Sequence, residues 1–319
     1  MPNFIAKKSL GQHFLHAPNV VGAMIHAARI EPGIIVLEIG PGKGILTRGL
    51  LKAGAKVIAV EKDQRAIEYM KENFAEEVGS GTLRLIQDDI LAINPADLGL
   101  EKEKYIIAAN IPYYITGEIL RKFLTTQVCP ACMVLLVQKE VAKRIVAADK
   151  KESILSISVK AYGEPKYINT VPKRFFRPIP KVDSAIISID KISKRFFEDN
   201  SVIPASRSEA KAQAGILSDG GTSSVGSNKI NLESGELQDP RFRGDDKKDK
   251  DDKVDEKWFF EVVRAGFAHK RKVVRGNLAK IIPAQALERL WKEKRWPDND
   301  RAEDFTLEQW KELIHGLEN

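Results

Sequence analysis

The chain has 319 residues, a net charge of +7, a pI of about 9.1 and two cysteines. This length accommodates two domains, since domains run to roughly 100–200 residues each. Two cysteines cannot build a disulfide framework, so we expect a reducing, cytoplasmic compartment. No apolar run approaches the roughly 20 residues that span a bilayer, and the basic balance favours a polyanionic partner.

From about residue 17 to 190, buried-strand patterns alternate with helical periodicity. Helices are predicted at 20–30, 43–52 and 63–74, and strands at 34–39, 56–60, 83–87, 105–109 and 133–138. Strands that alternate with helices predict a parallel sheet covered on both faces. Residues 153–160 and 182–190 also have strand patterns, without a crossover helix between them, so we expect one reversed strand near an edge of the sheet.

The remaining chain divides into two different segments. Residues 191–254 are rich in Ser, Gly, Asp, Asn and Lys, and their apolar content is too thin to offset the entropy of ordering, which predicts a disordered insertion. Helical periodicity returns from 255 to 319, with helices expected near 258–267, 270–281, 284–293 and 306–317. We therefore predict a main α/β domain over 1–190 and a small all-helical domain over 255–319.

A glycine-rich turn follows the first predicted strand. Gly40, Gly42 and Gly44 follow the spacing Gly-x-Gly-x-Gly, and Glu61 ends the next strand about 20 residues on, where an acid binds ribose hydroxyls. This spacing differs from that of dinucleotide binders and favours a nucleoside ligand, with S-adenosylmethionine as the candidate. Asp89, past the strand at 83–87, is positioned to accept from an adenine amino group. A purely structural turn at the glycines, and a helix N-cap or turn residue at Asp89, are the alternatives.

The loop Asn110-Ile111-Pro112-Tyr113 leaves the strand at 105–109 and predicts a second ligand, a flat amino-bearing ring. Methyl transfer to an exocyclic adenine nitrogen is favoured by hydrogen-bond acceptors aimed at its N–H groups. The Asn110 side chain and the Ile111 carbonyl can supply them, Pro112 has no competing N–H, and Tyr113 can stack on the base. Positioning and electrostatics would carry such a reaction.

Phe176 is a candidate for the second face of an aromatic clamp around a flipped base, with core packing as the alternative. Basic residues flank it and recur in the C-terminal segment, where a solvated basic face is the competing interpretation. Contacts of this kind with phosphates give affinity and register. The candidate RNA-binding residues are Lys173, Arg174, Arg177, Lys181, Lys270, Arg271, Lys272 and Arg275.

Cys129 and Cys132 are spaced Cys-x-x-Cys, which raises redox and zinc interpretations. A structural zinc site takes about four ligands, and no second Cys/His pair lies at suitable spacing. We therefore expect ordinary part-buried thiols and no metal.

Taken together, the motifs resemble the ribosomal small-subunit rRNA adenine N6,N6-dimethyltransferases. The matching segments are 11–15, 38–44, Glu61, 87–89, 110–113, 176–185 and 267–272. The resemblance implies a seven-stranded class I methyltransferase (Rossmann-like) sheet with a helical C-terminal domain, and dimethylation of two adjacent adenosines near the 3′ end of 16S rRNA. It implies that His13, Leu15 and Gly40 contact the methionine and ribose ends of S-adenosylmethionine, with Gly42 in the same turn.

The same resemblance implies that Glu61 holds the ribose, that Asp89 lies near the adenine, and that Asn110 lies between cofactor and target base. The partner implied is 16S rRNA in the small ribosomal subunit, with the protein acting as a monomer. One departure is the segment 191–254, where the family has a short linker.

Three rival functions remain. The first is a 23S rRNA adenine methylase of the erythromycin-resistance type, which segment 267–272 argues against. The second is a non-catalytic small-subunit assembly factor or a transcription factor, which the intact loop 110–113 argues against. The third is a small-molecule methyltransferase, disfavoured by the basic C-terminal domain.

Overall fold

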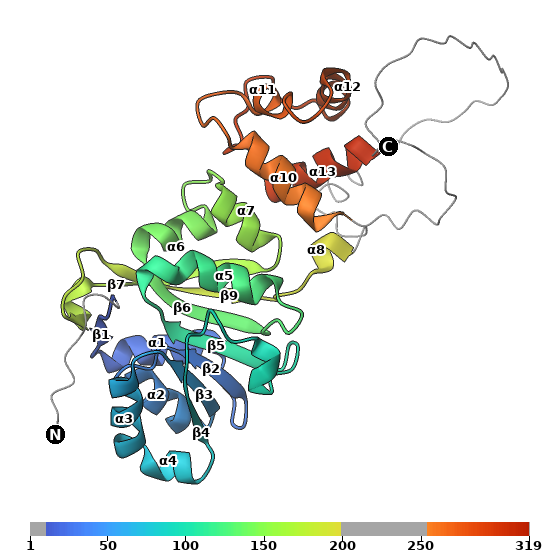
Figure 1. Cartoon of the computed structure of the whole chain (residues 1–319). Coiled ribbons are helices and arrows are strands. Elements are labelled where there is room, and N and C mark those ends of the chain that lie inside the picture. Colours follow the sequence, from blue (N-terminus) through green and yellow to red (C-terminus); the bar gives the residue numbers. More distant parts are fainter. Residues whose placement is uncertain (1–10, 199–253, 319) are drawn as a thin grey trace, which may run out of the picture. The chain divides into compact units, whose positions relative to one another are not determined.

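A seven-stranded sheet organises the main part of the molecule (Figure 1). The computed structural model describes residues 11–198 and 254–318. The strand order in the sheet is β4-β3-β2-β5-β6-β9-β7. The strands are β2 (Ile35–Ile39), β3 (Lys56–Glu61), β4 (Leu83–Gln87), β5 (Tyr105–Asn110), β6 (Cys132–Gln138), β7 (Glu164–Val171) and β9 (Ser184–Asp190).

The sheet is parallel except at one strand. β2 pairs in parallel with β3 on one side and β5 on the other, while β9 runs antiparallel to both β6 and β7. The strands that come next in the sequence, β3 and β4, extend the sheet on one side of β2, and the later strands extend it on the other side, beginning with β5. Ligands bind at such a switch point, beyond the carboxyl ends of the strands. The predicted doubly wound sheet with one reversed strand is confirmed, and β9 lies one position in from the edge.

Helices cover both faces of this sheet because alternate residues of each buried strand point to opposite sides. Val36 belongs to an apolar cluster with α1 and α2, whereas Leu37 belongs to a larger cluster with α5, α6 and α7. These helices are α1 (Pro18–Ala28), α2 (Ile45–Lys52), α5 (Thr116–Thr125), α6 (Lys139–Val146) and α7 (Ile154–Lys160), and α3 (Gln64–Asn73) and α4 (Ala75–Gly79) precede β4.

The strand predicted at 153–160 is wrong, because residues 154–160 form helix α7. Ser153 begins that helix with a capping box, in which its hydroxyl accepts from the backbone N–H of Ser156 and the Ser156 side chain binds back. The apolar residues at 155, 157 and 159 alternate as in a strand. The local cap, together with burial of Ile157 and Val159, decides in favour of the helix.

The C-terminal segment is helical, as predicted, with α10 (Glu256–Gly266), α11 (Val274–Leu278), α12 (Ala284–Lys294) and α13 (Leu307–Glu318). The helix expected over 270–281 is shorter than predicted, because residues 270–272 form a turn. Asn277 stabilises this turn by donating its side-chain amide to the carbonyls of Gly266, at 2.7 Å, and His269, at 3.1 Å.

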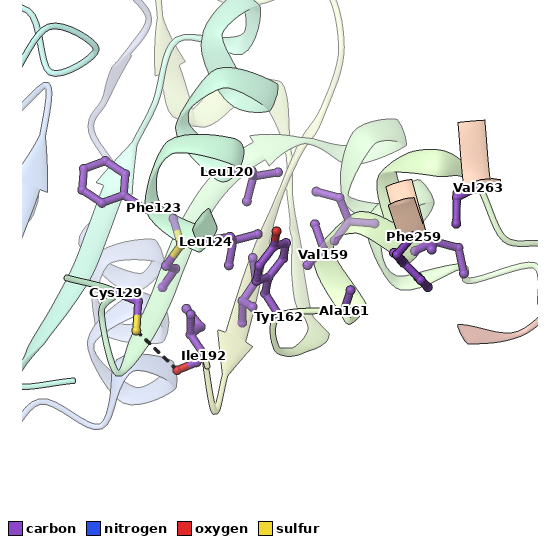
Figure 2. Close-up of a cluster of buried hydrophobic side chains, with 14 of the residues drawn as sticks. Leu120, Phe123, Leu124, Cys129, Val159, Ala161, Tyr162, Ile192, Phe259 and Val263 are labelled. Carbon is purple, nitrogen blue, oxygen red and sulfur yellow. Dashed lines mark hydrogen bonds between the residues drawn. The ribbon is translucent and has the colours of Figure 1, made fainter. Parts of the chain in front are cut away.

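Helix α10 joins the larger apolar cluster (Figure 2). Leu120 and Leu124 of α5, Val159 of α7, and Phe259 and Val263 of α10 extend into the same apolar region. Burial of aromatic side chains of this size is among the larger contributions to a core. The Tyr162 hydroxyl adds a hydrogen bond to this packing, because it donates to the Glu256 carboxylate at 2.6 Å.

The first residues of the predicted insertion are described, and they are ordered. Arg195–Glu198 form the short helix α8, and Phe197 is buried against an aromatic cluster that includes Phe259. The Val254 backbone N–H donates to the Phe197 carbonyl at 3.1 Å. The rest of the predicted insertion, 199–253, lies outside the described residues.

Both cysteines are buried and free. Cys129 donates to the Ile192 carbonyl at 3.8 Å, and Cys132 donates to Asp190 at 3.3 Å. Burial raises the pKa of Cys132 to about 12, so its thiol stays protonated. Within residues 11–198 and 254–318, no helix is long and apolar enough to cross a membrane.

Candidate functional site

The glycine turn after β2 forms one wall of a cavity of about 330 Å³. Gly40, Gly42 and Gly44 have φ angles of 67°, 56° and 73°, a left-handed conformation that glycine adopts without steric cost. Neighbouring rings close the space around two of them. A Cβ on Gly42 would lie 3.1 Å from the Phe14 ring, and one on Gly44 would lie 2.5 Å from the Phe74 ring. The turn is therefore closely packed as well as conformationally demanding.

Glu61, at the end of β3, is buried beside this turn and lines the cavity. One carboxylate oxygen accepts from the Gly42 backbone N–H at 3.3 Å, and the other accepts from the Asp63 backbone N–H at 2.9 Å. Burial raises the pKa of Glu61, while these two hydrogen bonds act in the opposite direction. The carboxylate is thus held in one orientation by backbone groups.

Glu38, in β2, is a second buried carboxyl in the cavity wall, with 1% of its surface exposed. The Thr47 hydroxyl of α2 donates to it at 2.6 Å. Burial raises the pKa of Glu38 to about 8, opposed by the Thr47 hydrogen bond and reinforced by the charge of Glu61. Sequence reasoning did not assign Glu38 to the site. The sequence does contain a sign of it, because Glu38 is a charged residue within an otherwise apolar strand.

Asp89 lies past the end of β4, at the cavity. Its side chain accepts from Lys62 Nζ at 2.8 Å and from the Leu91 backbone N–H at 3.0 Å. The Lys62 hydrogen bond is the main reason that the pKa of Asp89 is lowered. Asp89 therefore both organises the local turn, as the alternative interpretation held, and presents a carboxylate beside the cavity.

The loop 110–113 forms the opposite wall. The Asn110 side-chain amide donates to the His13 carbonyl at 3.2 Å, which directs its oxygen away from that carbonyl. Ile111 and Pro112 line the cavity beside it. The Tyr113 ring stacks on the His13 ring with 6.1 Å between centroids and 23° between planes.

A short N-terminal segment, residues 11–15, completes the enclosure. Strand β1 (Phe14–Leu15) pairs antiparallel with β8 (Phe176–Arg177). His13 Nδ1 donates to the Pro178 carbonyl at 2.7 Å, and Gln12 donates to Asp63 at 3.0 Å. These contacts bring a segment far away in the sequence to the glycine turn.

Most of the predicted ligand residues line this one cavity: His13, Leu15, Gly40, Gly42, Glu61, Asp89, Asn110, Pro112 and Tyr113. The lining also contains Gln12, Glu38, Lys62 and Tyr114, which were not predicted. Among the described residues, no group of three or more His, Cys, Asp or Glu side chains is placed to hold a metal ion.

Phe176 is not among the residues that line this cavity, and its place in an aromatic clamp stays a prediction. It is 1% exposed and packs in the apolar cluster with Leu15 and Val171. Its position in β8, paired with β1, turns the ring into the core. The ring that stacks on Tyr113 comes from His13.

The basic residues of the segment 173–181 are exposed. Lys173 and Arg174 lie in a single helical turn, η4 (Lys173–Phe175), and Arg177 lies in β8. The Lys173 backbone N–H donates to the Asp183 carboxylate at 3.0 Å, and Lys173 is exposed. Lys181 is exposed as well. The segment thus presents positive charge next to the strand that pairs with residues 14–15.

The C-terminal basic residues differ among themselves. Lys270, Arg271 and Lys272 are exposed in the turn between α10 and α11. Arg275 is half-buried and forms an ion pair with Asp298 at 3.0 Å. A cation that already has a partner gains less from a phosphate, so the turn 270–272 is the stronger of the two candidates.

Comparison with known proteins identifies the family of this chain. The sequence profile of the ribosomal RNA adenine dimethylase family matches residues 3–203. A ribosomal RNA small subunit methyltransferase A from Dehalococcoides mccartyi is 44% identical over 184 residues, which are 58% of this chain and 62% of that protein. A protein of the same name from another strain of that species is 33% identical over 310 residues, 97% of this chain and 87% of the relative.

The fold has solved counterparts too. The crystal structure of the 23S rRNA methyltransferase ErmE matches with a TM-score of 0.65 and 20% identity, covering 96% of this chain and all of that one. At this identity the likeness concerns the fold alone. The family profile and the near-full-length relative together show that the chain belongs to the ribosomal RNA adenine dimethylase family.

Proposed function

We propose that the protein transfers methyl groups from S-adenosylmethionine to N6 of two adjacent adenosines, dimethylating each, in a hairpin loop near the 3′ end of 16S rRNA. The substrate would be the small ribosomal subunit, and the modification would contribute to its biogenesis. Family membership supports this proposal. The observation that carries it is the joining of loop 110–113 and the Glu61 carboxylate in one cavity.

The cavity suits S-adenosylmethionine in size and charge. Its volume of about 330 Å³ falls within the range of small-ligand pockets, roughly 300–1,000 Å³. The carboxylate of buried Glu61 would repel a phosphate and attract a cation. Glu61 would accept from ribose hydroxyls, and Asp89 would accept from the adenine amino group. The hydrogen bond from Lys62 to Asp89 would then weaken. When bound, the cofactor supplies an electrophilic methyl group on its sulfonium.

The loop residues would serve the acceptor base. The Asn110 oxygen and the Ile111 carbonyl accept from the N6–H groups of the target adenine, which helps the nitrogen lone pair leave conjugation with the ring. Tyr113 stacks on the base and limits its orientations. As positive charge develops on N6, the same oxygens stabilise it, and the proton then leaves to water.

Exposed cations would hold the RNA. Lys173, Arg174, Arg177 and Lys181 lie along one segment, and Lys270 to Lys272 along another. Phosphate contacts of this kind supply affinity and register, while the choice of target follows from an unstacked loop. The basic character of both segments supports an RNA substrate over a small molecule.

The deciding experiment incubates purified protein with small subunits that lack the dimethyl groups, using S-adenosylmethionine as methyl donor. Mass spectrometry of the 3′ fragment of the rRNA should show two added methyl groups on each of two neighbouring adenosines. Already dimethylated subunits and large subunits serve as controls. A protein that binds immature subunits but adds no methyl mass would instead be a non-catalytic assembly factor, and methylation of 23S rRNA would support the other rival.

A further inference from the structure

The first residue of β9, Ser184, is fully buried. It lies opposite Gln138 of β6 and Val171 of β7, where all three strands reach the cavity end of the sheet. The hydroxyls of Ser184 and Tyr113 share a hydrogen bond of 2.7 Å. This bond joins the sheet to the aromatic ring of the cavity wall.

The position of Ser184 is itself well determined. Asp183, the preceding residue, accepts at its carbonyl from the Lys139 backbone N–H at 3.0 Å. Its carboxylate accepts from the Lys173 backbone N–H at 3.0 Å. Contacts with two different elements restrain the start of β9, and a hydroxyl on a restrained strand end is a stable anchor for a side chain that packs on it.

Tyr113 is therefore restrained at two places. Ser184 holds its hydroxyl, and the His13 ring covers one face at 6.1 Å between centroids. Burial raises the pKa of Tyr113, so the phenol remains protonated and keeps this hydrogen bond at neutral pH. A ring held by its hydroxyl and by one face presents the other face in a defined plane.

We propose that Ser184 is a positioning residue for the target base: it fixes the plane of the Tyr113 ring against which the adenine stacks. This inference rests on the proposed function, because it needs an adenine in the cavity. Ser184 does not touch the reacting atoms. Its effect passes through Tyr113 alone, which distinguishes it from a residue that supports the sheet in general.

Two variants remove the same hydrogen bond from its two ends. Ser184→Ala and Tyr113→Phe should each lower kcat/KM for small subunits about fivefold to tenfold, the fold-change that corresponds to one neutral hydrogen bond. The Kd of S-adenosylmethionine should stay within twofold of wild type in both. Because the pathway runs through the Tyr113 hydroxyl, Ser184→Ala should cause less than a further twofold loss in the Tyr113→Phe background.

Ser188→Ala is the matched control, since Ser188 is also buried in β9, four residues further along the same strand. It should leave kcat/KM for RNA near the wild-type value. If wild type adds no methyl group, the proposed function fails. If wild type is active and Tyr113→Phe matches it, or if the two losses are fully additive, the role of Ser184 is disproved. Tyr113→Phe decides the question even if Ser184→Ala does not fold.

Discussion

The two halves of the cavity are built from different kinds of contact. On the cofactor side, backbone N–H groups hold the Glu61 carboxylate, and the contacts span 19 and 2 residues of sequence. On the base side, side chains are fixed by groups 97 and 71 residues away, His13 for Asn110 and Ser184 for Tyr113. The Glu61 carboxylate is thus held by nearby turns, whereas Asn110 and Tyr113 depend on distant segments of the assembled fold.

This difference predicts separable losses, and the largest belongs to Asn110. In the proposed reaction, Asn110→Ala would remove an acceptor from the nitrogen that gains charge, so kcat should fall about 1,000-fold. Cofactor affinity should weaken less than about tenfold. Single-turnover methylation and calorimetric titration measure the two quantities. The exposed Asn169 of β7 offers a control, Asn169→Ala, which should leave both unchanged. An equally large loss of cofactor affinity would show that Asn110 contributes as much to cofactor binding as to catalysis.

Glu61→Ala tests the other half. Loss of a charged acceptor for ribose hydroxyls should raise the Kd of S-adenosylmethionine about 10- to 100-fold, since hydrogen bonds to charged groups are worth about 1.5–3 kcal/mol. The Kd for small subunits should change less than threefold. Glu72→Ala, on the exposed surface of α3, is the control. An equal loss of RNA affinity would show that the halves are not independent.

The buried Glu38 gives the cofactor half a pH dependence. Its pKa is raised from 4.5 to about 8, so the folded chain keeps a proton that the unfolded chain releases between these values. Stability of the ligand-free protein should therefore fall as the pH rises through this window. Glu38→Gln keeps an acceptor for Thr47 and should flatten this slope, raising the melting temperature at pH 8 by at least about 2 °C. An unchanged slope in thermal melts would contradict the assignment.

A smaller effect is expected on the salt dependence of RNA binding, and it should differ between Lys272 and Arg275. Lys272→Gln should reduce the slope of log Kd for RNA against log salt concentration by about 0.7 to 0.9, the change expected when one phosphate is no longer neutralised. Arg275→Gln should change it less, because Arg275 already pairs with Asp298. Filter binding at several salt concentrations distinguishes them. Equal slopes for the two variants would mean that the ion pair opens in the complex.

The smallest effect is expected from residues 199–253. The hydrogen bond between Phe197 and Val254 places the flanking backbones side by side, so a short Gly–Ser link can join them. Methylation by the shortened protein should stay within twofold of the full chain. A larger loss would assign a role in function to the removed residues.

The sequence predicts most of what is local. The strand ends at Glu61 and Asn110, and the turn at Gly40 to Gly44, follow from apolar runs and glycine spacing. The helix at 154–160 was missed because its apolar residues alternate, and the Ser153 capping box outweighs that pattern. The burial of Phe176 could not be predicted from the sequence, because a strand of two residues, β8, sets the direction of the ring through its pairing with β1. Such pairings depend on distant segments and leave no periodic signal.

The His13 ring stacks on the Tyr113 ring, so in the proposed complex the target base would take the other face. One face receives one base at a time, so two neighbouring adenosines would have to enter in turn. After the first adenosine is modified, it must leave the cavity. The RNA must then shift by one nucleotide before the second adenosine can enter. The rate of the second modification would then depend on how readily the RNA loop rearranges, and a stiffened loop would delay the second adenosine more than the first.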